Sequence, residues 1–179
     1  METRTDLTAF AAKIGEVRKR IADVVVGQTE AVDMLLTCII ADGHVLLEGV
    51  PGVAKTLLAR LMSRLIDARF SRIQFTPDLM PSDVLGTSVF NMKTQEFSFH
   101  PGPAFADIIL ADEINRAPAK TQAALFEVME ERQATIDGTS YKMGDVYTII
   151  ATQNPIAVSY THLRAHETRR HLVCRLLLE

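Results

Sequence analysis

A glycine-rich turn that ends in lysine and threonine is the segment of this sequence with the clearest chemistry. It follows the apolar run 44–48 and consists of Gly49, Val50, Pro51, Gly52, Val53, Ala54, Lys55 and Thr56. In such a turn, small residues let backbone N–H groups point at phosphate oxygens, the lysine reaches the β- and γ-phosphates, and the threonine hydroxyl binds Mg²⁺. Leucines at helical spacing begin at Leu57, so a helix N-terminus would add its dipole to the same site. The turn predicts a site for a nucleotide's phosphates; the alternative is a chance glycine–proline turn before a helix.

A pair of acids at the end of an apolar run supplies the second part of that chemistry. Asp112 and Glu113 follow residues 108–111, which are all small or apolar and predict a parallel strand buried on both faces. Ligands of open parallel sheets bind at the carboxyl ends of strands. There Asp112 could hold Mg²⁺, directly or through water, and Glu113 could take a proton from an attacking water. The alternative is a strand that ends in a solvated turn.

A third apolar run ends in polar residues in the same way. Residues 146–152 predict another buried strand, and Asn154 follows it closely. An amide at that point could orient the attacking water or contact the γ-phosphate. By itself this signal is weak, because Gln-Asn-Pro is also a common turn. Its order and spacing after the other two motifs favour the functional interpretation.

The three motifs resemble those of AAA+ ATPases, and the segments between them are similar to the MoxR family. The similar strings are 26–28, 43–52, 72–79, 102–103, 112–117 and 151–156, so the resemblance spans about residues 22 to 156. The general phosphate loop has glycine before its lysine, whereas this chain has Ala54, which is usual in this family. The resemblance implies an α/β fold of the P-loop NTPase type, an αβα sandwich around a mainly parallel sheet.

The resemblance also implies a role for each motif residue. Lys55 and Thr56 would bind phosphate and Mg²⁺, Asp112 and Glu113 would be the Walker B pair, and Asn154 would be sensor 1. Residues near the adenine would be Val25, Val26 and Gly27. Arg116 follows the acids, and its side chain would either reach a neighbouring subunit or be a plain surface charge.

For the whole protein, the resemblance implies a hexameric ring that hydrolyses ATP. The hydrolysis would drive the remodelling or maturation of protein complexes. The partners of the ring would be protein clients, including proteins with von Willebrand A domains. Two other functions stay open: a nucleotide-dependent assembly switch with little hydrolysis, and a P-loop kinase. By family analogy this chain lacks the arginine finger, sensor 2, the helical lid and a fifth strand. We therefore expect a hydrolysis-deficient fragment in which residues 45–47 form an exposed sheet edge.

The last part of the chain departs from the family. Residues 157–168 and 172–179 resemble the translation of the two halves of a transposase-type sequencing adapter. The codons between the halves leave a gap of about eight bases, the size of a sample barcode. We therefore expect an AAA+ nucleotide-binding domain over 1–156, without its lid, and a non-native tail over 157–179. On this interpretation the His162 and His166 pair is not a metal site.

Composition narrows the class of protein further. The 179 residues carry a formal net charge of −3, which becomes −5 without the four arginines and two acids of the tail, and this argues against nonspecific nucleic-acid binding. Cys38 lies in an apolar helical stretch and is predicted to be buried, without a disulfide. The N-terminus has no apolar signal segment and no run is long enough for a membrane span, so a cytoplasmic location is expected.

The remaining pattern predicts the elements that position the motifs. Apolar residues at helical spacing predict helices over 7–21 and from an N-cap at Thr29 to a stop at Gly43. A strand is predicted over 70–76, and a helix begins at Pro118. Two hairpins are predicted, one over 88–99 and a tight one around 135–139. In the family the first hairpin lies near a central pore; a plain surface hairpin is the alternative.

Overall fold

A parallel sheet between two layers of helices forms the centre of the fold. The computed structural model describes residues 7–25, 27–49, 55–153 and 173–178. Within these residues, the sheet has the strand order β2-β5-β8-β1-β9, and every neighbouring pair is parallel. Its strands are β1 (His44–Gly49), β2 (Phe70–Gln74), β5 (Ile108–Asp112), β8 (Thr148–Gln153) and β9 (Val173–Leu178). The predicted αβα sandwich is confirmed.

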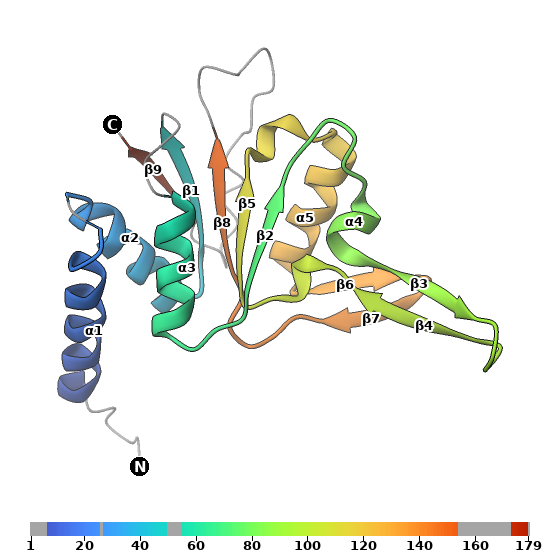
Figure 1. Cartoon of the computed structure of the whole chain (residues 1–179), viewed down its shortest axis with the longest axis horizontal. Helices are drawn as coiled ribbons and strands as arrows, with labels where there is room; N and C mark the ends of the chain where they lie inside the picture. The colour runs from blue at the N-terminus through green and yellow to red at the C-terminus, as the bar shows by residue number, and fades with distance from the viewer. Residues whose placement is uncertain (1–6, 26, 50–54, 154–172, 179) are drawn as a thin grey trace.

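The helices divide between the two faces of the sheet (Figure 1). One face is covered by α1 (Leu7–Ala22), α2 (Thr29–Ile40) and α3 (Lys55–Leu65), and the other by α4 (Pro81–Leu85) and α5 (Ala119–Glu131). Two short 3₁₀ turns, η1 (Pro103–Phe105) and η2 (Ile114–Arg116), flank β5. Among the described residues, no helix combines the length and apolar character needed to cross a bilayer.

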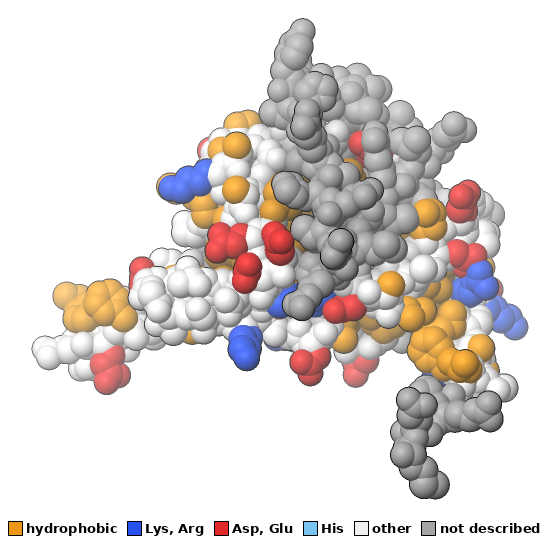
Figure 2. Space-filling view, turned by 180° about the vertical axis from the view of Figure 1, so that it is seen from behind, with side chains coloured by type: hydrophobic (Ala, Val, Ile, Leu, Met, Phe, Trp, Pro, Cys, Tyr) orange, Lys and Arg blue, Asp and Glu red, His pale blue; other side chains and the backbone are white. Residues whose placement is uncertain are grey.

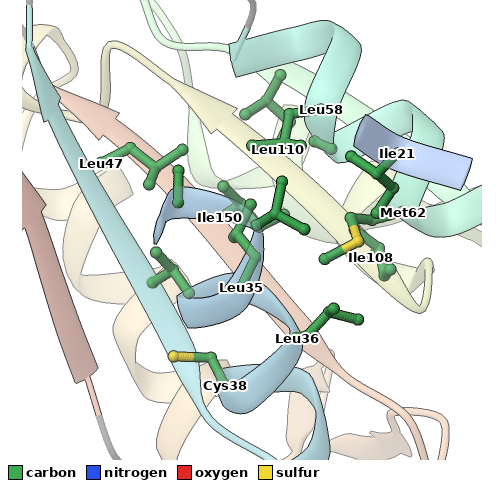
Figure 3. Close-up of a cluster of buried hydrophobic side chains, with 14 of the residues drawn as sticks. Ile21, Leu35, Leu36, Cys38, Leu47, Leu58, Met62, Ile108, Leu110 and Ile150 are labelled. Carbon is green, nitrogen blue, oxygen red and sulfur yellow. The ribbon is translucent and has the colours of Figure 1, made fainter. Parts of the chain in front are cut away.

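Alternate residues of the central strands contribute side chains to two separate hydrophobic cores. Ile108 and Leu110 of β5 lie in the core under α2 and α3, whereas Ile109 and Ala111 lie in the core under α5. All four are completely buried. Figure 3 shows the first core, in which Ile21, Leu35, Leu36, Cys38, Leu47, Leu58, Met62, Ile108, Leu110 and Ile150 meet. A strand buried on both faces requires an unbroken apolar run, which is what the sequence has here.

The expectation that β1 forms an exposed sheet edge is wrong for this structure. Strand β9 pairs with β1 in parallel, from His44 opposite Val173 to Gly49 opposite Leu178. The N–H and C=O groups on the outer side of an edge strand are a template for any extended segment that reaches them. Residues 173–178, which belong to the segment expected to be a non-native tail, take that place.

Two helix boundaries differ from the sequence prediction. Thr29 is the first residue of α2 rather than its N-cap, which is Gln28 and makes no side-chain capping hydrogen bond. The helix ends at Ile40, before Gly43, whose N–H then donates to the Cys38 carbonyl at 2.8 Å. Cys38 is buried, as predicted.

Both predicted hairpins are present. They are β3 (Gly86–Asn91) with β4 (Glu96–Pro101), and β6 (Gln133–Ile136) with β7 (Thr139–Lys142). The second turns through Asp137 and Gly138, both with positive φ, which is the geometry of a tight type I′ hairpin. Phe99 and Tyr141 stack with ring centroids 4.0 Å apart and so join the two hairpins. Figure 2 shows apolar side chains at the free end of the longer hairpin, where Val89, Phe90, Met92 and Phe97 are exposed.

A salt bridge ties the beginnings of β2 and β5 together. The backbone N–H of Arg69 donates to Oδ2 of Asp107 at 2.8 Å, and the Arg69 guanidinium lies 2.6 Å from Oδ1 of the same carboxylate. These contacts hold the pKa of the Asp107 carboxyl below its ordinary value. Since the two strands pair in parallel from Phe70 opposite Ile108, the same contacts fix where their carboxyl ends lie.

Two glycines cross at the base of the β3–β4 hairpin without room for a side chain. A Cβ added to Gly102 would lie 2.5 Å from the backbone N of Gly86 and 2.5 Å from the Val84 carbonyl oxygen. Gly86 itself has φ +96°, in the region that favours glycine. The close approach of two backbones therefore sets the direction of the hairpin.

We predict that Gly102→Ala destabilises the chain by on the order of 2 kcal/mol, because backbone atoms must move to admit the methyl group. Gly15→Ala is the matched control, since a Cβ at Gly15 in α1 meets nothing within 4 Å. There the change should raise stability by about 0.5–1 kcal/mol through helix propensity. Thermal and denaturant unfolding of both variants measures the difference. Equal stabilities for the two variants would show that the crossing is not tightly packed.

Candidate functional site

Two of the polar residues singled out from the sequence, Asp112 and Glu113, lie at the carboxyl edge of the sheet. In parallel strands the carboxyl ends meet at the same edge, and ligands of such sheets bind there. Glu48 near the end of β1 is opposite Gln153 at the end of β8, and Ala111 of β5 is opposite Ala151. The last residue of β5 is Asp112, so this acid lies beside the ends of the two neighbouring strands.

The phosphate-loop residues 50–54 lie outside the described residues, whereas the helix that follows them is described. Helix α3 begins at Lys55, and Lys55 and Thr56 are both half-buried in its first turn, followed by the exposed Leu57. Burial lowers the pKa of Lys55, while the negative charge of Asp112 acts in the opposite direction. The lysine and the acid therefore lie within electrostatic reach of one another, across the space between α3 and β5.

Four other predicted residues are placed less fully. Val26 and Asn154 lie outside the described residues; Asn154 comes directly after Gln153, the last residue of β8. Gly27 lies between α1 and α2 with φ +83°, and Val25, two residues earlier, is buried in the first core. The expected contacts of these residues with adenine and with the γ-phosphate stay predictions.

Asp112 is held from two sides. Its Oδ1 accepts a hydrogen bond from the Thr152 hydroxyl at 2.5 Å, and its Oδ2 lies 2.6 Å from Nη2 of Arg72. Thr152 belongs to β8 and Arg72 to β2, the strands on either side of β5. The carboxylate is thus oriented by both neighbours of its own strand.

Glu113 is held by different donors. Its Oε2 accepts from Nε2 of Gln74 at 3.0 Å and from Nη1 of Arg116 at 2.7 Å. Gln74 in turn accepts a hydrogen bond from Arg72 at 2.8 Å, so Arg72 and Gln74 link the two acids. Arg116 is half-exposed, and within this chain its partner is the neighbouring acid, a contact that neither sequence-based alternative included.

Arg72, Gln74 and Thr152 were not predicted to belong to the site. Arg72 and Gln74 are two residues apart on β2, so a strand places both side chains on the same face. That spacing could have been noticed, but its meaning depends on β2 being the neighbour of β5, which only the topology shows. Thr152 is 3% exposed, and the sequence pattern predicts only that it belongs to a buried strand.

The donors at this edge fit a magnesium ion bound together with phosphate. Thr56 and Asp112 offer the hydroxyl and carboxylate oxygens that Mg²⁺ prefers. Among the described residues, no group of three or more histidine, cysteine, aspartate or glutamate side chains could hold a metal ion. Mg²⁺ in proteins is usually bound through one or two carboxylates and completes its shell with water and phosphate oxygens.

Comparison with known proteins places the chain in a family. Residues 44–172 match the model of the ATPase family associated with various cellular activities (AAA). A solved structure of a protein assigned as an ATPase from Cytophaga hutchinsonii superposes with a TM-score of 0.72 at 41% identity, covering 96% of this chain and 55% of that one.

The curated relatives include proteins named for the MoxR group. The chain is 48% identical over 149 residues to the uncharacterized protein YeaC of Bacillus subtilis, covering 83% of this chain and 47% of that protein. It is 48% identical over 150 residues to Chaperone MoxR1 of Mycobacterium tuberculosis, covering 82% of this chain and 40% of that protein. Protein MoxR of Methylorubrum extorquens is 30% identical to the chain over 155 residues, covering 84% of this chain and 45% of that protein. The chain spans less than half the length of these relatives, and it belongs to the MoxR family of AAA+ ATPases.

Proposed function

We propose that the intact protein containing this chain binds ATP with Mg²⁺ at the carboxyl edge of the sheet and hydrolyses it. The observation that carries the proposal is the pair of acids Asp112 and Glu113 at the carboxyl end of β5, each held by side chains of the neighbouring strands. Helix α3 begins with Lys55, and a cation at a helix N-terminus together with such acids is suited to a polyphosphate bound with a divalent ion.

Each residue of the site has a defined task in this proposal. Lys55 and the helix N-terminus bind the phosphates, Thr56 and Asp112 hold Mg²⁺, Glu113 accepts a proton from the attacking water, and Asn154 orients that water. The phosphates are also bound by the loop backbone and by Leu57 in the first turn of α3; the loop residues are Gly49, Val50, Pro51, Gly52, Val53 and Ala54. Val26 and Gly27 lie beside the adenine. Bound Mg²⁺ would neutralise charge that develops on the phosphate oxygens. The protein's contribution is therefore mostly positioning and charge stabilisation.

One observation favours the alternative of a nucleotide-dependent switch with little hydrolysis. Oε2 of Glu113 accepts hydrogen bonds from both Gln74 and Arg116. These two donors occupy one of the two oxygens that could accept a proton from the attacking water. Turnover then requires that a water reach the other oxygen or that one donor leave. The Glu113 variant described below separates the two functions.

The cellular role is proposed from the relatives. The name Chaperone MoxR1 of the mycobacterial relative supports a chaperone-like role, and we propose that this role is the remodelling or maturation of protein complexes. The family resemblance is the basis for proposing protein clients that include von Willebrand A-domain proteins. A hexameric ring and a cytoplasmic location complete the proposal. An arginine finger contributes about 10³–10⁵ in rate in such enzymes. Because the family has its finger beyond the described region, we propose that the 179-residue chain alone binds ATP weakly and hydrolyses it negligibly.

We predict that Lys55→Ala in the intact protein lowers the affinity for ATP–Mg²⁺ by about 10²-fold, the cost of losing charge-assisted hydrogen bonds to phosphate. Isothermal titration calorimetry measures this directly. Lys142→Ala removes an exposed lysine of β7 and should leave the affinity unchanged. If Lys55→Ala binds ATP as the unaltered protein does, the first turn of α3 is not the phosphate site.

We predict that Glu113→Gln binds ATP within about twofold of the unaltered protein but hydrolyses it about 10²–10⁴ times more slowly, the range that general-base catalysis contributes. Phosphate release under saturating ATP measures the rate. Glu127→Gln, on the exposed side of α5, is the control and should hydrolyse normally. Unchanged turnover in Glu113→Gln would remove Glu113 from the role of base, and slow turnover in every form would favour the switch.

We propose that the nucleotide-binding domain comprises residues 1–156 and that residues 157–179 are a non-native tail. Determining the reading frame at the source locus from a library made without such adapters tests this proposal. We expect the frame to continue past Ile156 into the arginine finger and lid of the family. If Ser159-Tyr160-Thr161-His162 is found again, the segment is native and the proposal is wrong.

A further inference from the structure

We propose that Thr152 is a positioning residue for ATP hydrolysis, which acts through both acids at the end of β5. This inference rests on the proposed function of that site. Thr152 is not among the residues whose motifs suggested a role. Its hydroxyl contacts Asp112, which is proposed to hold Mg²⁺, and Glu113, which is proposed to accept a proton from the attacking water.

The backbone turns sharply where the two acids follow one another. Glu113 has φ +56° and ψ 47°, a left-handed conformation that residues other than glycine rarely adopt. In a continuing strand, Asp112 and Glu113 would point to opposite faces of the sheet. With the turn, the Asp112 carboxylate meets Arg72 and the Glu113 carboxylate meets Gln74, two side chains on the same face of β2. The left-handed turn therefore brings both acids to the same side.

The Thr152 hydroxyl fixes that arrangement with two hydrogen bonds. It donates to Oδ1 of Asp112 at 2.5 Å and accepts from the backbone N–H of Glu113 at 2.9 Å. A hydroxyl is the small group that can donate and accept at once, so one atom holds both the carboxylate of the first acid and the backbone of the second. The register places it there, because Ala111 pairs with Ala151 and Thr152 is the next residue.

Burial makes the hydroxyl difficult to replace by water. The Thr152 residue is 3% exposed, so a hydrophobic group in its place would leave the Asp112 oxygen and the Glu113 N–H without this partner. The left-handed turn would then lose the contact that holds it, and both acids would gain freedom to move. Small displacements of groups that orient metal ligands commonly cost 10- to 100-fold in metal affinity or activity.

The test compares variants of the intact protein that keep or remove the hydroxyl. Thr152→Val has the same shape without the hydroxyl, Thr152→Ala removes it in a smaller side chain, and Thr152→Ser keeps it. The matched control is Thr121→Val, which removes another buried hydroxyl, one that donates to the Leu79 carbonyl at 2.7 Å between α5 and the segment before α4. Thermal unfolding identifies any variant that does not fold.

We expect Thr152→Val and Thr152→Ala to lower kcat by about 10- to 100-fold and to raise the Mg²⁺ concentration for half-maximal turnover by about 10-fold. KM for ATP should stay within about threefold, because the phosphate-binding lysine is unaltered. Thr152→Ser and Thr121→Val should both behave nearly as the unaltered protein. A purely structural role would lower the unfolding temperature without this specific change in the Mg²⁺ requirement. Normal turnover without the hydroxyl, or a Thr152→Ser variant as slow as Thr152→Val, would overturn the proposal.

A second measurement does not depend on hydrolysis. Amide hydrogen exchange at Glu113 should be at least about 10-fold faster in Thr152→Val than in the unaltered protein or Thr152→Ser, with exchange in the middle of β5 unchanged. If no form hydrolyses ATP, the proposed function fails, and this exchange rate still decides whether Thr152 holds the turn. Unchanged exchange at Glu113 would show that it does not.

Discussion

The parallel pairing of β5 with β8 is the interaction on which the rest of this structure depends. Its register runs from Ile108 opposite Thr148 to Ala111 opposite Ala151, and both strands are buried on both faces. Successive residues therefore supply two different cores, one on each side of the sheet. A shift of one residue would exchange the faces of every side chain in the strand. The same shift would separate Asp112 from Thr152, so core packing and the geometry of the candidate site are fixed by one register.

Charge at the carboxyl edge is balanced within the chain. Two acids that follow one another repel, and bringing them to one side of the sheet would be costly without donors. Arg72 and Arg116 supply positive charge, and Gln74 joins the two acids through Arg72. Lys55 faces the same region from α3. A nucleotide with its metal ion would enter a site in which cations already surround the acids, so binding requires that these contacts be shared or exchanged.

The outer parts of the fold show how the sheet is completed. Strand β9 covers the outer side of β1, which would otherwise offer its backbone groups to another chain. On the far side, the two hairpins project from the domain (Figure 1). The stacked rings of Phe99 and Tyr141 join them. The crossing of Gly86 and Gly102 sets the direction of the longer hairpin, and its apolar end is exposed.

Local patterns in the sequence determined the fold class, the central strands, both hairpins, the burial of Cys38 and the family. They did so because strand runs, helical spacing and turn residues are properties of short segments. Helix ends were less accurate: Thr29 begins α2 but does not cap it, since capping depends on backbone angles at Gln28. Tertiary structure alone decided that Arg72, Gln74 and Thr152 surround the acids, and that β9 pairs with β1. Strand order and register bring together residues far apart in the sequence, such as Asp112 and Thr152, which are 40 positions apart, and no local pattern carries that information.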